Sequence, residues 1–319
     1  MKKTLFYYLL LSIGLSNEVQ YKELLLTGLI TNPKQEISSM DWYNNQLVLL
    51  PENLGGFLYM IPKNRIESAI ESTAPIPIKP EQPIFSTPDY TKSIPGFEGL
   101  EAIVFHKNNV YITLEANDNG KMQGYLAWGN IDPSTYEVTI PKNNILKLDT
   151  PIQVKNMAFE SLLIYKNSVI AIYEAQGINL QKSTWQYSIS MDDHSITKIN
   201  FPNIEYRIND VSKIDKSNNF WAINYLWVGD KKYLKPGPDS LSITYGQGET
   251  HTIFPHVERL VEFTIKGDGI DLTDIAPIQL VLNEDNSRNW EGIVRFGNKG
   301  LLIATDKYPG MILGFVPFN

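Results

Sequence analysis

The feature that most constrains this chain is a pattern that returns five times along its 319 residues. Each copy begins with a small or acidic residue, continues through a turn rich in Asn and Lys, and ends in an apolar strand. The copies begin at Ser38, Glu101, Glu160, Asp210 and Glu291. The second and third copies align without a gap, so that Glu115 stands over Glu174. Each copy is typical of two strands joined by a tight hairpin.

Two further strands follow most copies, for example at residues 184–190 and 195–201 after the third copy. Four antiparallel strands per repeat form the blade of a β-propeller, so the sequence predicts an all-β, five-bladed propeller. The last copy is followed by only one strand, at 311–318. We therefore expect an N-terminal strand at 23–30 to complete the last blade, since this closure leaves no exposed sheet edge.

Residues 63–98 are rich in Pro, Ile and Ser, and we expect an extended loop there. The alternative is a sixth blade in the same stretch. A second long connection, residues 227–257, separates two strands of the fourth blade and should spring from the mouth of the channel. Long connections of this kind are commonly functional, so a lid or wall is expected there.

The N-terminus predicts export. A basic start, Met1 to Thr4, precedes an apolar run at 5–15 and then polar residues, the order of a secretory signal peptide. We assign residues 1–17 to the signal and 18–319 to a single domain, periplasmic or extracellular and monomeric. A buried N-terminal strand or helix is the alternative. There is no Cys for a disulfide, the run at 5–15 is too short to span a membrane, and the rest of the sequence has no long apolar run.

The five copies place acidic side chains in one layer, because the first strand of each propeller blade lines the central channel. This layer comprises Ser38, Glu101, Glu160, Asp210 and Glu291, and the nearby second strands end at Glu52, Glu115, Glu174, Asn224 and Asp306. Clustered carboxylates repel one another unless they are protonated or neutralised by a cation. Calcium accepts six to eight oxygen ligands and is the predicted ion. The layer could also hold ordered water in place of an ion; alternatively, these residues cap strands or bond backbone amides of neighbouring blades.

The channel mouth is expected to bind a small-molecule or phosphorylated ligand. Arg207, Arg288 and Lys307 lie beside the predicted channel strands and are candidates to stabilise negative charge. The alternative for both arginines is pairing with carboxylates of neighbouring blades. The net charge of −7 disfavours a nucleic-acid partner, although acidity is also a common route to solubility. No Gly-x-Ser-x-Gly or P-loop motif is present.

The blade starts resemble those of the phytase-like family described as having esterase-like activity. The resemblance is carried by Trp290-Glu291-Gly292, Glu101-Ala102-Ile103 and Phe159-Glu160-Ser161. The layer also resembles the calcium rings of five-bladed calcium-activated nucleotidases and SdiA-regulated bacterial propellers, which usually have Ser where this chain has Asp210. These resemblances imply an exported calcium-binding propeller that hydrolyses a phosphate ester or another ester. The alternative is a non-catalytic ligand-binding or scaffold propeller with structural calcium.

Overall fold

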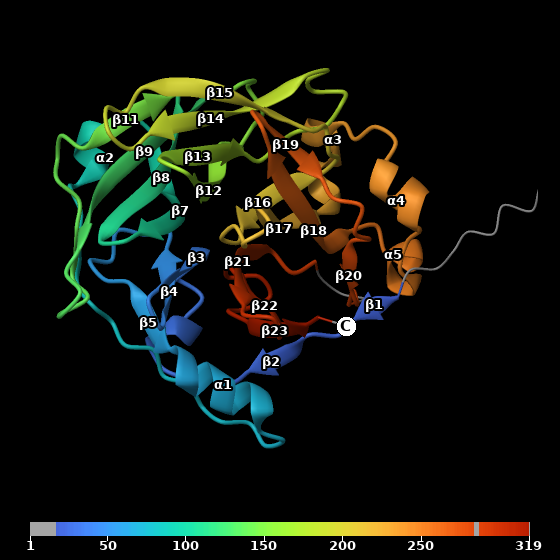
Figure 1. Ribbon diagram of the computed structural model, residues 1–319, viewed down its shortest axis with the longest axis horizontal. Coiled ribbons are helices and arrows are strands. Elements are labelled where there is room, and N and C mark those ends of the chain that lie inside the picture. Colours follow the sequence, from blue (N-terminus) through green and yellow to red (C-terminus); the bar gives the residue numbers. More distant parts are fainter. Residues whose placement is uncertain (1–16, 284–286, 319) are drawn as a thin grey trace, which may run out of the picture.

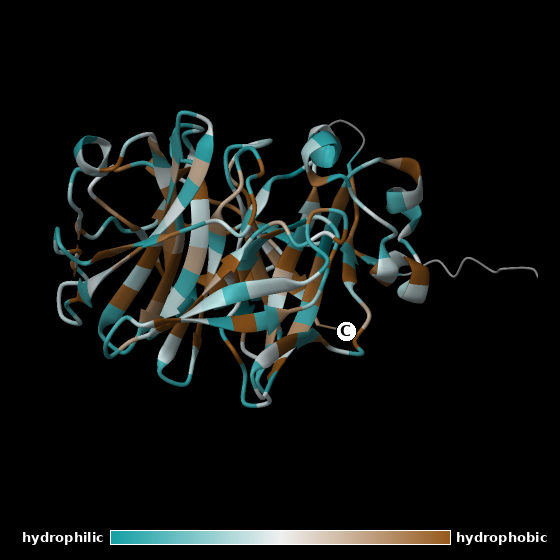
Figure 2. Cartoon of the chain, turned by 90° about the horizontal axis from the view of Figure 1, so that it is seen from above, coloured by the Kyte–Doolittle hydropathy of each residue, from teal (hydrophilic) through white to brown (hydrophobic). Residues whose placement is uncertain are grey.

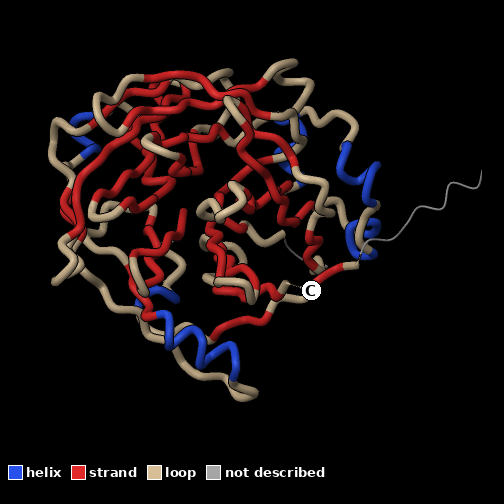
Figure 3. Tube along the Cα trace, viewed as in Figure 1, coloured by secondary structure: helices blue, strands red, loops and turns tan. Residues whose placement is uncertain are grey.

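The computed structural model describes residues 17–283 and 287–318, and these form an all-β, propeller-like fold. The sheets stand around a central axis, and short helices lie at the periphery (Figure 1, Figure 3). Apolar residues concentrate on the strands, while the connecting loops are mostly polar (Figure 2). All but the last residue of the expected signal peptide lies outside the described residues. No helix within the described ranges is long and apolar enough to cross a membrane.

Five innermost strands surround the axis, and each packs beside the next, with the last beside the first. They are β3 (Ile37–Tyr43), β7 (Phe97–His106), β12 (Phe159–Tyr165), β16 (Arg207–Val211) and β21 (Trp290–Phe296). Their antiparallel partners are β4 (Gln46–Pro51), β8 (Asn109–Asp118), β13 (Ser168–Tyr173), β17 (Asn219–Leu226) and β22 (Gly300–Thr305). The five hairpins expected from the repeat are therefore present. Asn44 and Asn218 adopt positive φ in two of the turns, a conformation that Asn tolerates well.

Outer strands extend each hairpin away from the axis. These are β5 (Tyr59–Pro62) beside β4; β9 (Lys121–Ile131), β10 (Val138–Thr139), β11 (Ile145–Leu148) and β6 (Phe85–Ser86) beyond β8; β14 (Thr184–Ser190) and β15 (Ile196–Phe201) beyond β13; and β18 (Val257–Lys266), β19 (Gly269–Leu272), β20 (Ile278–Leu280) and β1 (Glu18–Val19) beyond β17. Apolar side chains fill the spaces between neighbouring sheets, as where Met40 and Leu49 pack with Val294 and Leu302.

The last sheet combines the two ends of the chain. It has the order β2-β23-β22-β21, in which β23 (Leu313–Pro317) pairs with β22 and the N-terminal β2 (Lys22–Leu24) pairs antiparallel with β23. The N-terminal strand is shorter than the expected 23–30. Gly28 has a positive φ of 88°, which breaks the extended conformation before the 3₁₀ helix η1 (Leu29–Thr31).

Two long connections differ from a plain loop. Residues 63–98, expected to be extended, contain α1 (Lys63–Glu71), β6 and α2 (Tyr90–Ser93) before β7 begins. Helix α1 forms because Ile66 and Ala69, three residues apart, are buried on one face against β2 and β5. The connection at 227–257 contains η2 (Val228–Asp230), α3 (Lys231–Leu234), α4 (Ser240–Tyr245) and α5 (Glu249–Ile253).

Candidate metal centre and mouth cavity

Each inner strand contains a β-bulge near its start. In β3, β7, β12 and β21 an extra residue interrupts the register at Ser38, Glu101, Glu160 and Glu291, and β7 has a further shift at Glu98. A large apolar residue precedes each one; in β3, β12 and β21 it pairs with the last residue of the second strand, and in β7 Leu100 pairs with Leu114 inside β8. A bulge bends its strand and changes the direction of the extra side chain. Four of the five residues predicted for the layer thus occupy one equivalent position.

The fifth position needs a correction of one residue. In β16 the irregularity covers Asn209 and Asp210. Ile208 pairs with the second strand as Phe159 does before Glu160, so Asn209 is the residue equivalent to Glu160. β16 ends at Val211 and β17 begins only at Asn219, whereas Lys166 and Asn167 alone separate β12 from β13. Because this turn is longer, spacing to the second strand does not fix the register.

Asp210 joins neighbouring inner strands through the backbone. Its Oδ1 accepts a hydrogen bond from Val211 N and its Oδ2 accepts one from Ile293 N of β21, each at 2.9 Å. Ser39, the residue after Ser38, similarly accepts from Ile103 N of β7 at 3.3 Å. Burial holds the pKa of Asp210 well above its usual range. The backbone-bonding alternative therefore describes the contacts of Asp210.

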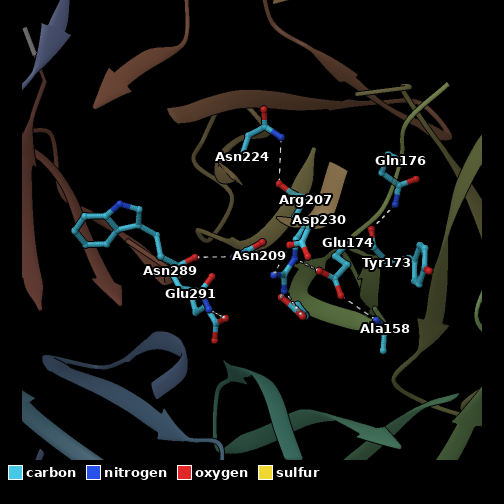
Figure 4. A network of polar contacts seen from close by, with 12 residues as sticks. Ala158, Tyr173, Glu174, Gln176, Arg207, Asn209, Asn224, Asp230, Asn289 and Glu291 are labelled. Atoms are coloured by element: carbon cyan, nitrogen blue, oxygen red, sulfur yellow. Dashed lines mark hydrogen bonds and ion pairs between the residues drawn. The ribbon is translucent and has the colours of Figure 1, made fainter. Parts of the chain in front are cut away.

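Asn209 offers an unused acceptor at the equivalent position. Its side chain is fully buried, and its Nδ2 donates to the Trp290 carbonyl at 2.9 Å. Its Oδ1 is buried without a hydrogen-bond partner among the described residues. Figure 4 shows Asn209 between Glu291 and Arg207. An amide oxygen of this kind is a suitable calcium ligand. The repeated apolar residue before each bulge was the sequence signal that could have identified it.

Glu115 in β8 and Glu174 just after β13 belong to the predicted second-strand layer, and they lie beside Glu160 of the inner strands. Oxygens of Glu115, Glu160 and Glu174 lie within 4.8 Å of one another, and all three side chains are buried. At the matching position of the fourth hairpin stands Tyr225, because Asn224 pairs with Ile208. Asn224, expected in this layer, instead donates to backbone carbonyls, including that of Glu205 at 2.9 Å.

Burial and mutual repulsion raise the pKa values of several carboxyl groups in the channel. Burial, followed by repulsion from neighbouring carboxylates, raises the pKa of Glu101 and Glu115 well above the usual range. The pKa of Glu291 is raised in the same way, with repulsion from Asp306 the largest cause after burial. Burial and a hydrogen bond with Glu36 raise the pKa of Glu52 to about 8. A bound cation would relieve this repulsion.

Arg207 is a cation already located in this cluster. Its Nη2 donates to both oxygens of Glu160, at 2.9 and 3.1 Å, and its Nε donates to Glu174. Its Nη1 lies 3.7 Å from Asp230 Oδ2 in the 227–257 connection. Figure 4 shows the guanidinium group directed at these carboxylates. Its charge is therefore balanced within the protein.

A cavity of about 670 Å³ adjoins Arg207 at the channel mouth. Its lining comprises Asn156, Arg207, Tyr225, Trp227, Asp230, Ser287, Asn289, Asp306, Tyr308 and Pro309. Trp227 and Tyr308 are 51% and 59% exposed, so their aromatic faces are available to a ligand. Buried polar groups with half-exposed aromatic walls are typical of a small-molecule site.

The other two predicted cations are placed differently. Arg288 is 1% exposed, donates through Nε to Glu258 at 2.8 Å, and does not line the cavity. Lys307 forms an ion pair with Glu36. Neither side chain presents an unpaired charge to the mouth.

Comparisons with known proteins support the fold and do not assign a family. No family model matches the chain, and no curated protein matches it. The GH43 endo-arabinanase from Bacillus licheniformis has a similar structure, with a TM-score of 0.50, 12% sequence identity, and coverage of 92% of this chain and 96% of that one.

Two other solved structures show a weaker likeness. A glycoside hydrolase of the GH130 family has a TM-score of 0.49, 10% identity and 94% coverage of both chains. A glucose dehydrogenase has a TM-score of 0.44, 12% identity, and coverage of 90% of this chain and 98% of that one. Identities this low are informative about fold alone. The likeness to the endo-arabinanase supports a propeller-like fold, and no neighbour named here singles out the phytase-like family.

Proposed function

We propose that the protein is a five-bladed propeller that binds calcium on the channel layer of Ser38, Glu101, Glu160, Asn209 and Glu291. The blade count is supported by the closed circle of five inner strands and by β2, which completes the last sheet. The observation that carries the metal proposal is the equivalent β-bulge in all five strands, which gives five oxygen-bearing side chains one shared position.

The donor set suits a hard cation. The five residues supply three carboxylates, one amide oxygen and one hydroxyl, and calcium prefers six to eight oxygens in flexible geometry. Ser38 Oγ donates to the Leu100 carbonyl at 2.6 Å, which leaves its lone pairs as acceptors. A soft or nitrogen-preferring metal is disfavoured because the layer contains no Cys or His.

We further propose that the exported protein hydrolyses a phosphate ester or another ester in the mouth cavity, as the phytase-like resemblance implies. The cavity favours this candidate because it shares Arg207 with the carboxylate cluster. A bound calcium ion would supply Lewis-acid polarisation of an ester oxygen. In the alternative, a non-catalytic binding propeller, the ion only holds the inner strands together.

Thermal melting in calcium and in a chelator tests the ion. A ligand present at 100 times its Kd stabilises the folded state by about 2.7 kcal/mol, so calcium should raise the melting temperature clearly. Calorimetric titration should give one calcium ion per chain. An unchanged melting temperature in the wild type and in the Glu101→Gln/Glu160→Gln double variant would show that the layer binds no calcium.

Two adjacent residues provide a matched control. Asn209→Asp adds a carboxylate to the layer and should tighten calcium binding, whereas Asn209→Leu should abolish the calcium-dependent shift. Asp210→Asn should lower the melting temperature in the chelator but leave the calcium-dependent shift intact. If Asp210→Asn abolished the calcium-dependent shift in melting temperature and Asn209→Leu kept it, the calcium ligand would be Asp210 and not Asn209.

Assays with phosphate and carboxylate esters, with and without calcium, separate the enzyme from the binding propeller. We expect calcium-dependent turnover in the wild type and none in the Glu101→Gln/Glu160→Gln variant. Calcium binding without turnover of either ester class would favour the non-catalytic alternative.

A further inference from the structure

Glu160 belongs to two arrangements that compete for the same oxygens. It occupies the bulge position of the calcium layer, and both of its carboxylate oxygens accept from Arg207 Nη2. A carboxylate that coordinates a dication gives up much of its negative charge and at least one oxygen to the ion. Its hydrogen bonds to a guanidinium group are weakened as a result.

We infer that calcium binding loosens Arg207 from Glu160 and thereby makes it the anion-binding group of the mouth cavity, where it holds a phosphate monoester. This inference rests on the calcium layer proposed above. It makes the phosphate site conditional, because without the ion Arg207 is fully engaged with Glu160, Glu174 and, more distantly, Asp230.

The position of Arg207 supports this role. It lines the cavity and is 8% exposed. Its guanidinium group therefore already lies at the cavity wall and has only to exchange hydrogen-bond partners to contact a ligand. Glu174, which is fully buried, would continue to hold Nε. The planar fork of Arg fits two phosphate oxygens at once, a geometry that the ammonium group of Lys cannot reproduce.

The cavity walls fit the organic part of such an ester. Trp227 and Tyr308 present half-exposed aromatic faces, and Ser287 and Asn289 add hydrogen-bonding groups. Asp230 stands on the cavity side of Arg207 and competes with a ligand anion for Nη1, since the two lie 3.7 Å apart. Removal of the Asp230 charge should therefore strengthen phosphate binding.

Calorimetric titration with phenyl phosphate tests the inference on the whole protein. Coupling between two sites commonly changes affinity by about 5- to 150-fold, so calcium should tighten phenyl phosphate binding roughly tenfold. By reciprocity, saturating phenyl phosphate should tighten calcium binding by the same factor. Asp230→Asn should bind phenyl phosphate more tightly than the wild type in calcium, and benzoate serves as the matched ring without a phosphate.

The outcomes separate this inference from the calcium proposal. Calcium-dependent melting together with equal phenyl phosphate affinity in calcium and in chelator would overturn the coupling but leave the calcium layer standing. Calcium-dependent melting with undiminished binding in Arg207→Gln would show that the ester contacts the ion directly and would overturn the role of Arg207. Benzoate binding as tight as phenyl phosphate would overturn the phosphate preference. An absent calcium shift in the wild type would overturn the calcium layer itself.

Discussion

Two buried charged regions of this protein are built on opposite principles. Beside the 227–257 connection, each buried arginine has its own carboxylate: Arg288 pairs with Glu258 and Arg259 pairs with Asp239, with N–O distances of 2.8 Å. Trp290 Nε1 also donates to Glu258 at 2.7 Å. In the channel, by contrast, the cluster that includes Glu101, Glu115, Glu160, Glu174 and Glu291 shares Arg207 as its one closely bonded cation among the described residues.

The difference distinguishes a structural ion pair from the proposed ligand site. A balanced pair satisfies its own hydrogen bonds, and removal of either partner leaves a buried charge uncompensated. A surplus of like charges instead costs folding free energy unless a ligand or protons neutralise it. Burial alone therefore does not distinguish the two regions, whereas the ratio of carboxylates to cations does.

The largest effect is expected from breaking the balanced pair. Glu258→Gln should reduce the free energy of unfolding by about 3–5 kcal/mol, because it leaves the Arg288 charge buried and uncompensated. Denaturant titrations with and without calcium should give the same loss. The matched control is Glu71→Gln, which removes an exposed pair with Lys299 at 3.0 Å and should change stability by less than about 1 kcal/mol. A similar loss in both variants would contradict the comparison.

The second prediction is a gain in stability, opposite in sign to the loss expected for Glu258→Gln. Glu101→Gln should stabilise the chelated protein, since it removes one of several repelling carboxyl groups whose pKa values burial has raised. Most single substitutions destabilise a protein by about 1 kcal/mol, so a gain would itself be diagnostic. The same variant should lose stabilisation by calcium. Melting curves in chelator and in calcium measure both effects, and a loss of stability in chelator would contradict the assignment.

Much of this architecture could be predicted from the sequence, because a hairpin repeat reports local strand and turn patterns. The positions of Glu101, Glu160 and Glu291 followed from their alignment. Asn209 did not, since the register of β16 depends on a two-residue bulge and a long turn. Pairing of Arg207 with carboxylates of a neighbouring blade was foreseen as an alternative, but its partner Glu174 was not identified, because the pair joins residues from different hairpins. Charge balance is a tertiary property and becomes visible only when neighbouring blades are placed together.

A third prediction concerns pH and the channel. Glu52 has a folded pKa of about 8 against an ordinary value of 4.5, so the folded state binds more protons than the unfolded state between these values. The stability contributed by protonated Glu52 is therefore lost as pH rises from about 5 to 8. Melting of the chelated protein across this range should show the decline, and Glu52→Gln should reduce its slope, with the rest contributed by the other channel carboxyl groups of raised pKa. Calcium should also reduce the slope, because the ion replaces protons as the neutralising charge.

The smallest expected effect is local and concerns His251, in the region of balanced ion pairs. There stability should rise with pH, the opposite of the dependence expected in the channel. His251 Nδ1 lies 2.8 Å from Glu18 Oε1, while His251 Nε2 accepts from Glu258 N at 3.3 Å. Because Nε2 is an acceptor, the neutral ring donates through Nδ1, and burial lowers the pKa of His251 below 6.5. The folded state thus binds fewer protons than the unfolded state, and stability falls as pH drops through 6.5.

The loss of stability at low pH should be confined to α5 and to β1, the N-terminal strand that α5 contacts. Glu18 also accepts from Thr250 N at 3.0 Å, so the Thr250 amide should exchange with solvent faster at pH 5.5 than the intrinsic rate alone explains. His251→Gln should remove this pH dependence, because its amide does not titrate, whereas Glu52→Gln should leave it unchanged. Two results would contradict this separation: a change in Thr250 amide exchange in Glu52→Gln, or a change in the pH dependence of melting assigned to the channel in His251→Gln. Either would show that the two regions form one coupled network.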